Sequence, residues 1–148
     1  MEKNMEKTNF KWQADSCDDI KVLRYQGTGF EKLTLRQKKL VYYLSEAALC
    51  GSDILFDQNF KYNLRIRKVL EAIYKEYKGD RSVPEFAAFE KYLKKVWFAN
   101  GIHHHYSNEK FQPEFSENHF RELEGPVPSL QHDKENVLGL IPVVFVKE

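Results

Sequence analysis

The chain has 148 residues, of which 42% are hydrophobic and 30% are charged, and these proportions are typical of a soluble globular protein of one domain. Its 23 basic side chains nearly balance 22 acidic ones, so its charge does not favour binding to nucleic acid or to an anionic membrane. No run of about 18 apolar residues occurs, and residues 1–9 lack the apolar stretch of a signal peptide. We therefore expect a cytoplasmic protein with no membrane partner.

Cys17 and Cys50 are the two cysteines, and they are far apart in the sequence. This usage fits a reducing compartment and cannot supply a four-thiolate metal site. In the segment up to Tyr25 the pattern is mixed, with Ser16 or Asp18 as candidate helix caps. The glycines at 27 and 29 then predict a turn.

From Thr34, a candidate N-cap, apolar residues recur at helical spacing until Gly51, a candidate stop. This stripe predicts an amphipathic helix and consists of Leu40, Tyr43, Leu44, Ala47 and Ala48. Residues 56–63 are interpreted as a loop. A second helical stripe follows before Gly79, and its members are Ile66, Val69, Leu70, Ile73, Tyr74 and Tyr77.

A third helix is expected to begin near Pro84, with Ser82 as its candidate cap, and to bury Phe89, Leu93, Val96 and Trp97. After Asn100 the periodicity stops, and residues 101–113 predict an ordered loop rich in histidine and aromatic residues. A short helix over residues 116–123 is predicted, with Ser116 as its cap. The apolar residues 137–146 are interrupted by Gly139 and Pro142, so they predict at best one broken strand.

Three consecutive histidines, His103, His104 and His105, raise the question of a metal site, because imidazole is a common zinc ligand. In an extended loop adjacent side chains point to opposite faces, so only His103 and His105 could share a side. No His-Glu-x-x-His or His-Glu-x-x-Gly-His sequence occurs in the chain. We therefore expect no metal ligands here, with metal binding by the histidine run as a weaker alternative.

Other catalytic patterns are lacking as well. Gly-x-Ser-x-Gly does not occur, neither cysteine has an activating neighbourhood, and Gly27-Thr28-Gly29 lacks the further residues of a phosphate-binding loop. The residues alone indicate a helical module with a loop rich in histidine and aromatic side chains, and no catalytic residue.

The order and spacing of several long words resemble the N-terminal part of dipeptidyl peptidase III, in its Bacteroides type, over roughly three quarters of the chain. These words lie at residues 22–26, 37–38, 40–44, 47–51, 53–59, 62–67, 92–94, 96–98 and 100–106. The family usually carries glycine where this chain has Ser107. The resemblance weakens from about Glu124, so we divide the chain into a flexible N-terminus (1–9), a helical dipeptidyl peptidase III-like region (10–123) and a divergent tail (124–148).

The resemblance implies a mainly α fold, the helical part of the N-terminal lobe of a two-lobed metallopeptidase, with an irregular C-terminal tail and at most one or two short strands. In the family, the loop that matches residues 100–111 faces the cleft and shapes peptide-binding subsites. The matching substrate-cleft residues in this chain are Asn100, Gly101, His105, Tyr106, Lys110 and Phe111.

Family members are zinc exopeptidases that release dipeptides from peptide N-termini, and a His-Glu-x-x-Gly-His helix provides two zinc ligands and the catalytic Glu. This chain lacks that motif, so the resemblance implies an N-terminal fragment that binds no zinc itself and is inactive alone. Its partners would be short peptides and a lobe that carries the zinc. The alternative is a non-catalytic helical module that binds a peptide or a protein through Tyr106, Lys110 and Phe111.

Overall fold

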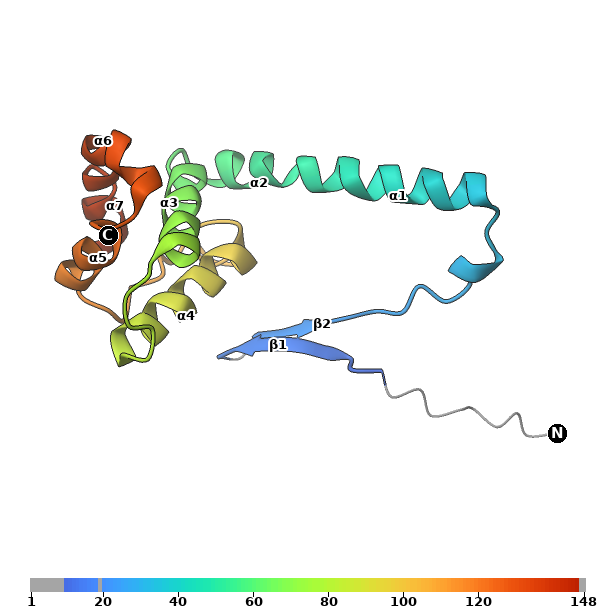
Figure 1. Cartoon of the computed structure of the whole chain (residues 1–148), viewed down its shortest axis with the longest axis horizontal. Helices are drawn as coiled ribbons and strands as arrows, with labels where there is room; N and C mark the ends of the chain where they lie inside the picture. Colours follow the sequence, from blue (N-terminus) through green and yellow to red (C-terminus); the bar gives the residue numbers. More distant parts are fainter. Residues whose placement is uncertain (1–9, 19, 147–148) are drawn as a thin grey trace. The chain divides into compact units, whose positions relative to one another are not determined.

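The computed structural model describes residues 10–18 and 20–146 and is mainly helical, with one two-stranded sheet (Figure 1). The chain divides into two compact units, Met1–Leu44 and Ser45–Glu148, which are described separately. The predicted fold class is confirmed. The predicted division at residues 123 and 124 stays a prediction.

In the first unit the chain forms an antiparallel hairpin from β1 (Gln13–Cys17) and β2 (Ile20–Leu23). Cys17 pairs with Ile20, and Asp18 has a positive φ of 52°, a conformation that aspartate tolerates better than most residues. The expected helix caps at Ser16 and Asp18 are therefore wrong, because this segment reverses in a tight turn instead of starting a helix. A short 3₁₀ turn, η1 (Phe30–Lys32), follows.

Helix α1 (Leu35–Cys50) begins as predicted after Thr34 and ends before Gly51. The Thr34 backbone N–H donates to Oε1 of Gln37 at 2.9 Å, and the Gln37 N–H donates to Oγ1 of Thr34 at 3.4 Å. This reciprocal capping box satisfies two N–H groups at the helix start. The apolar stripe is not buried: the structure describes every residue of α1, and none of them is buried.

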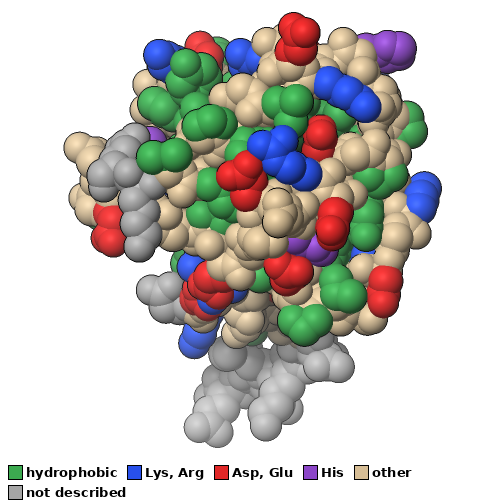
Figure 2. All heavy atoms as spheres, turned by 90° about the vertical axis from the view of Figure 1, so that its left-hand side faces the viewer, with side chains coloured by type: hydrophobic (Ala, Val, Ile, Leu, Met, Phe, Trp, Pro, Cys, Tyr) green, Lys and Arg blue, Asp and Glu red, His purple; other side chains and the backbone are tan. Residues whose placement is uncertain are grey.

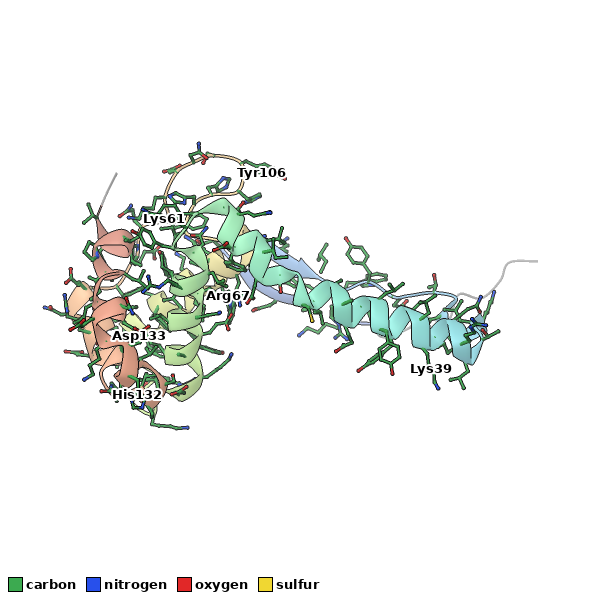
Figure 3. The ribbon with its side chains drawn as sticks, turned by 90° about the horizontal axis from the view of Figure 1, so that it is seen from above. Lys39, Lys61, Arg67, Tyr106, His132 and Asp133 are labelled. Carbon is green, nitrogen blue, oxygen red and sulfur yellow. The ribbon has the colours of Figure 1, made fainter. Side chains whose placement is uncertain are left out.

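The second unit begins its core with α2 (Ser52–Asn59). Residues 56–59 were predicted to lie in a loop, and that prediction is wrong, because they form the second half of α2. Phe56 is the single buried residue of this short helix. Arg67 holds α2 to the next helix: its guanidinium is 2.6 Å from Oδ1 of Asp53 and lies over the Phe56 ring at 4.6 Å (Figure 3). One buried residue gives too little periodicity to predict a helix.

Helices α3 (Asn63–Glu76) and α4 (Pro84–Ala99) form the centre of the second unit. Pro84 occupies the first turn of α4 as predicted, but the N-cap is Val83, and the Ser82 hydroxyl donates to Asp80 instead. Most of the two predicted stripes are buried, but the prediction that Trp97 is buried is wrong: it is 38% exposed, and its Nε1–H donates to Oε1 of Glu71 at 2.9 Å. The buried residues of the two helices include Ile66, Val69, Leu70, Ile73, Phe86, Phe89, Leu93 and Val96.

The remaining core comes from α5 (Glu117–Glu124), η2 (Pro128–Asp133), α6 (Lys134–Leu138) and α7 (Ile141–Phe145), which gather beside α3 (Figure 1). Ser116 caps α5 as predicted, accepting from the His119 N–H at 3.1 Å. The predicted broken strand at 137–146 is wrong, because Pro142 falls in the first turn of α7, where a missing N–H costs nothing. Within the described residues, no helix is both long and apolar enough to cross a membrane.

Candidate functional site

The histidine loop, residues 101–111, begins where α4 stops. Asn100 adopts the left-handed conformation with φ 53° and caps the helix, and the Gly101 N–H donates to the Val96 carbonyl at 3.1 Å. Asparagine is among the residues that reach this conformation most readily. The chain therefore leaves α4 in a sharply defined direction, as the Asn-Gly pair predicts.

Asn63, at the first position of α3, holds this turn from the other side. Its side chain is 1% exposed, its Oδ1 accepts from the Ile102 N–H at 3.1 Å, and its Nδ2 donates to the Asn100 carbonyl at 3.4 Å. Asn59 donates to the same carbonyl at 3.3 Å. A Cβ on Gly101 would lie 2.1 Å from Nδ2 of Asn63, so a glycine is needed where the turn crosses this side chain.

Backbone hydrogen bonds close the histidine loop into a hairpin-like hook. His103 and Lys110 form an antiparallel bridge, the Phe111 N–H donates to the Ile102 carbonyl at 2.8 Å, and the His104 N–H donates to the Glu109 carbonyl at 2.8 Å. The loop is thus ordered, as predicted, by pairing between its two arms.

The rings of the three histidines make different contacts. His103 meets the Phe60 ring edge-on at 5.2 Å, whereas the rings of His104 and His105 stack with centroids 4.7 Å apart. All three line one pocket, so the prediction that only His103 and His105 could share a side is wrong in leaving out His104, because the chain turns at His104–Ser107 and is not extended there. Tyr106 lies 4.1 Å from His105, ring centroid to ring centroid.

A pocket of about 480 Å³ lies between the histidine loop and the junction of α2 and α3. Its volume is within the usual range for small-ligand sites. The lining side chains are amides, imidazoles and one phenyl ring, with no Lys, Arg, Asp or Glu among those the structure describes. The lining residues are Asn59, Phe60, Asn63, Ala99, Asn100, Gly101, His103, His104, His105 and Asn108.

The predicted cleft residues divide into two groups. Asn100, Gly101 and His105 line the pocket. Tyr106, by contrast, is 89% exposed on the part of the loop that extends beyond the helices (Figure 3).

The other two predicted cleft residues face the protein. The Lys110 ammonium donates to the backbone carbonyl of Val146 at 2.5 Å, and the side chain is buried. Phe111 packs against the core with a contact to His104. Both residues therefore support the loop from behind and do not line the pocket.

Seven of the ten lining residues were not among the predicted cleft residues: Asn59, Phe60, Asn63, Ala99, His103, His104 and Asn108. Three of them lie at the α2–α3 junction, roughly forty residues before the loop, so no local spacing connects them with the histidines. The one usable signal was the cluster of asparagines and aromatic residues between two predicted helices, which is unusual for a plain connecting loop.

The family resemblance assigns zinc to another lobe, and a metal site in the described part of this chain would be one of its own. Among residues 10–18 and 20–146, no group of three or more His, Cys, Asp or Glu side chains could hold a metal ion.

Comparison with known proteins leaves the family unassigned. No protein-family model matches the chain, and a search of curated proteins found no match.

Proposed function

We propose that the chain binds a short peptide in the pocket between the histidine loop and the α2–α3 junction, without cleaving it. The pocket itself is the observation that supports this function. Amide and imidazole groups both donate and accept hydrogen bonds, so they match the alternating N–H and C=O groups of a peptide. Phe60 adds an apolar surface for a side chain.

We further propose that this binding unit is the N-terminal region of a dipeptidyl peptidase III-like zinc exopeptidase. The support is the order of the sequence words described above, together with a loop whose two arms are hydrogen-bonded to each other and that lines a pocket. Release of dipeptides would then depend on a lobe carrying His-Glu-x-x-Gly-His, which these 148 residues do not contain. The rival proposal is a helical module that binds a peptide or a protein and has no such lobe.

Peptide titration of the full chain tests the binding proposal. We expect an uncharged tetrapeptide to bind, and His105→Ala to weaken binding, since His105 lines the pocket. Tyr106→Ala should also weaken it by removing the ring that packs against His105. His132→Ala is the matched control, because His132 is exposed and far from Tyr106 (Figure 3). Equal affinities in all four proteins, or no binding at all, would refute the proposal.

A chelator separates this binding from metal chemistry. Excess EDTA should leave the affinity unchanged if amides and imidazoles contact the peptide directly. Zinc titration of the His103→Ala, His105→Ala double variant addresses the weaker metal-binding alternative: an identical response in wild type and variant eliminates it.

Sequencing the source DNA after codon 148 in all three frames tests the proposed family. A frame that encodes His-Glu-x-x-Gly-His would support the exopeptidase, and mixing the two pieces would then be the activity test. If no such frame follows, the rival module is favoured. A cytoplasmic location is also proposed, supported by Cys17 and Cys50, which do not form a disulfide, and cell fractionation tests it.

A further inference from the structure

A further pocket of about 280 Å³ lies in the second unit, between α3 and the segment formed by η2 and α6. It shares no lining residue with the pocket at the histidine loop. η2 packs against α3, and Figure 3 shows Asp133, the last residue of η2, beside that helix. Five apolar side chains form the floor, and all are buried or partly buried in the core of the unit: Val69, Ala72, Leu130, Val137 and Leu140.

Charged side chains lie at the rim of this pocket. Arg65 and Lys68 are three residues apart on α3, so they lie on the same face of the helix. Both are exposed, and neither makes a hydrogen bond or an ion pair with a described residue. Asp133 comes from the opposite wall; its Oδ1 accepts from Nδ2 of Asn136, and no described cation pairs with it. The rim thus carries two positive charges and one negative charge that do not pair with one another.

A ligand can contact both kinds of charge only if it carries an anionic and a cationic group. A carboxylate is the usual partner of Arg and Lys, and an ammonium donates hydrogen bonds to a carboxylate such as that of Asp133. The floor adds a third requirement, an apolar group, because burial of apolar surface is favourable. A free α-amino acid with an apolar side chain carries these three groups on one carbon. The pocket volume lies just below the usual range of about 300–1,000 Å³ for small-ligand sites, which suits a ligand of this size.

The geometry points to a binding site for a free zwitterionic amino acid with an apolar side chain, such as leucine. Its carboxylate contacts Arg65 and Lys68, and its ammonium contacts Asp133. Its side chain lies against Val69 and Val137. An ion pair at an exposed rim strengthens binding by about fivefold at most, so contact with the floor supplies much of the affinity. This site is separate from the proposed peptide binding, which uses other residues.

NMR titration of the isotope-labelled full chain with four ligands tests each contact. Leucine carries all three groups, N-acetyl-leucine lacks the ammonium, leucinamide lacks the carboxylate, and glycine lacks the side chain. We expect leucine to cause saturable shifts of the Val69 and Val137 amide signals. The two ligands that lack a charge should bind about two- to fivefold more weakly than leucine. Glycine should bind about tenfold more weakly.

Variants connect each ligand group with one wall of the pocket. The Arg65→Gln, Lys68→Gln double variant should weaken leucine about fivefold without weakening leucinamide. Asp133→Asn should weaken leucine about two- to fivefold without weakening N-acetyl-leucine. Asp57→Asn is the matched control, because Asp57 is exposed on α2 and lines no part of this pocket. A variant that failed to fold would bind none of the ligands, so these selective losses separate recognition from stability.

The outcomes that overturn the inference are specific. Leucine may cause no saturable shift, or the charge variants may bind it as wild type does, and either result refutes the site. N-acetyl-leucine that binds as tightly as leucine would identify an apolar anion as the occupant and would also overturn the inference. His105→Ala should weaken the tetrapeptide and leave leucine binding unchanged. Failure of the tetrapeptide alone would refute the proposed function and leave this site standing.

Discussion

At the scale of single residues, Asn63 joins parts of the chain that are 37 and 39 residues apart, through its bonds to Asn100 and Ile102. A backbone N–H that is buried without a partner costs about 1–3 kcal/mol. Asn63 therefore stabilises the fold and positions the candidate site with the same two hydrogen bonds. The shape of the pocket and the packing of the core therefore both depend on the Asn63 side chain.

Asn63→Ala should lower the free energy of unfolding by about 1–3 kcal/mol, because the buried Ile102 N–H loses its partner, whereas the Asn100 carbonyl still accepts from Asn59. Urea denaturation followed by circular dichroism measures the change. Asn108→Ala is the control, since Asn108 is exposed and should shift stability by less than about 0.5 kcal/mol. Equal effects of the two substitutions would mean that the Asn63 bonds contribute nothing.

Tyr92 presents the opposite case, a polar group that weakens the core. Its ring packs edge-on against Phe115 at 5.8 Å, while its hydroxyl is buried and has no hydrogen-bond partner among the described residues. Burial raises the pKa of this hydroxyl well above its ordinary value of 10.0, because the ionised form would be desolvated.

Tyr92→Phe should therefore leave stability unchanged or raise it by up to about 1 kcal/mol at neutral pH. The raised pKa adds a second expectation. The folded protein holds the Tyr92 proton more tightly than the unfolded chain, so stability is lost as pH rises above about 10. The variant should lose less stability between about pH 9 and pH 11 than the wild type. A variant that is strongly destabilised at pH 7 would show that the hydroxyl does have a partner.

At the scale of secondary-structure elements, the predictable helices were those that bury a full stripe. In α3 and α4 the core residues recur every three or four positions, so the sequence reports the helix directly. In α2 only Phe56 is buried. In α7 a proline and three β-branched residues give a sequence pattern that is typical of a broken strand. The secondary structure of a short element depends on the residues that pack against it in space, and local periodicity does not show which residues those are.

The candidate site was half predictable for the same reason. Asn100 and Gly101 predict a helix end followed by a turn, and the histidines after them indicate an unusual loop. The opposite wall comes from Asn59 and Asn63, whose participation depends on how α2 and α3 pack. The direction of Lys110 toward Val146 likewise depends on the position of α7 and has no local signal.

Glu76 ties the C-terminal end of α3 to η2, because its Oε2 accepts the Ser129 N–H at 3.1 Å. Two hydrogen bonds from Ser129 hold the pKa of Glu76 below its ordinary value of 4.5, and the bond from the hydroxyl has a larger effect than the bond from the backbone N–H. The folded state therefore binds fewer protons here than the unfolded state. The resulting stabilisation is present above about pH 5 and is lost as the pH falls through the lowered pKa.

Glu76→Gln removes this titration. We expect the stability difference between wild type and variant to be constant from about pH 6 to pH 8 and to shrink as the solution is acidified toward about pH 3. Urea midpoints at each pH provide the measurement. Glu90→Gln is the control, because Glu90 lies on α4 and the carboxylate that bonds Ser129 is that of Glu76. A difference that stays constant down to pH 3 would show that the bond to Ser129 has no influence on the acid titration.

At the scale of the whole molecule, the core of the second unit contains residues from both of the regions, 10–123 and 124–148, into which the sequence resemblance divided the chain. The core cluster contains Phe89 and Ile73 together with Leu130, Val137, Ile141 and Val144 from the segment called a divergent tail. The surface that these last helices present carries acidic and basic side chains interspersed with hydrophobic ones (Figure 2). Charge is thus spread over this face, in keeping with the balanced composition, and apolar packing accounts for the docking of the tail.

Two valines near the end of the described chain test how far the core depends on this tail. Val144 is 2% exposed and belongs to the core cluster, whereas Val146 is 58% exposed. Val144→Asp should lower the free energy of unfolding by about 3 kcal/mol or more, because it buries a carboxylate with no counter-charge. Val146→Asp should change it by less than about 0.5 kcal/mol. Urea denaturation of both variants is the measurement, and similar small effects would mean that Val144 of α7 does not pack into the core cluster in solution.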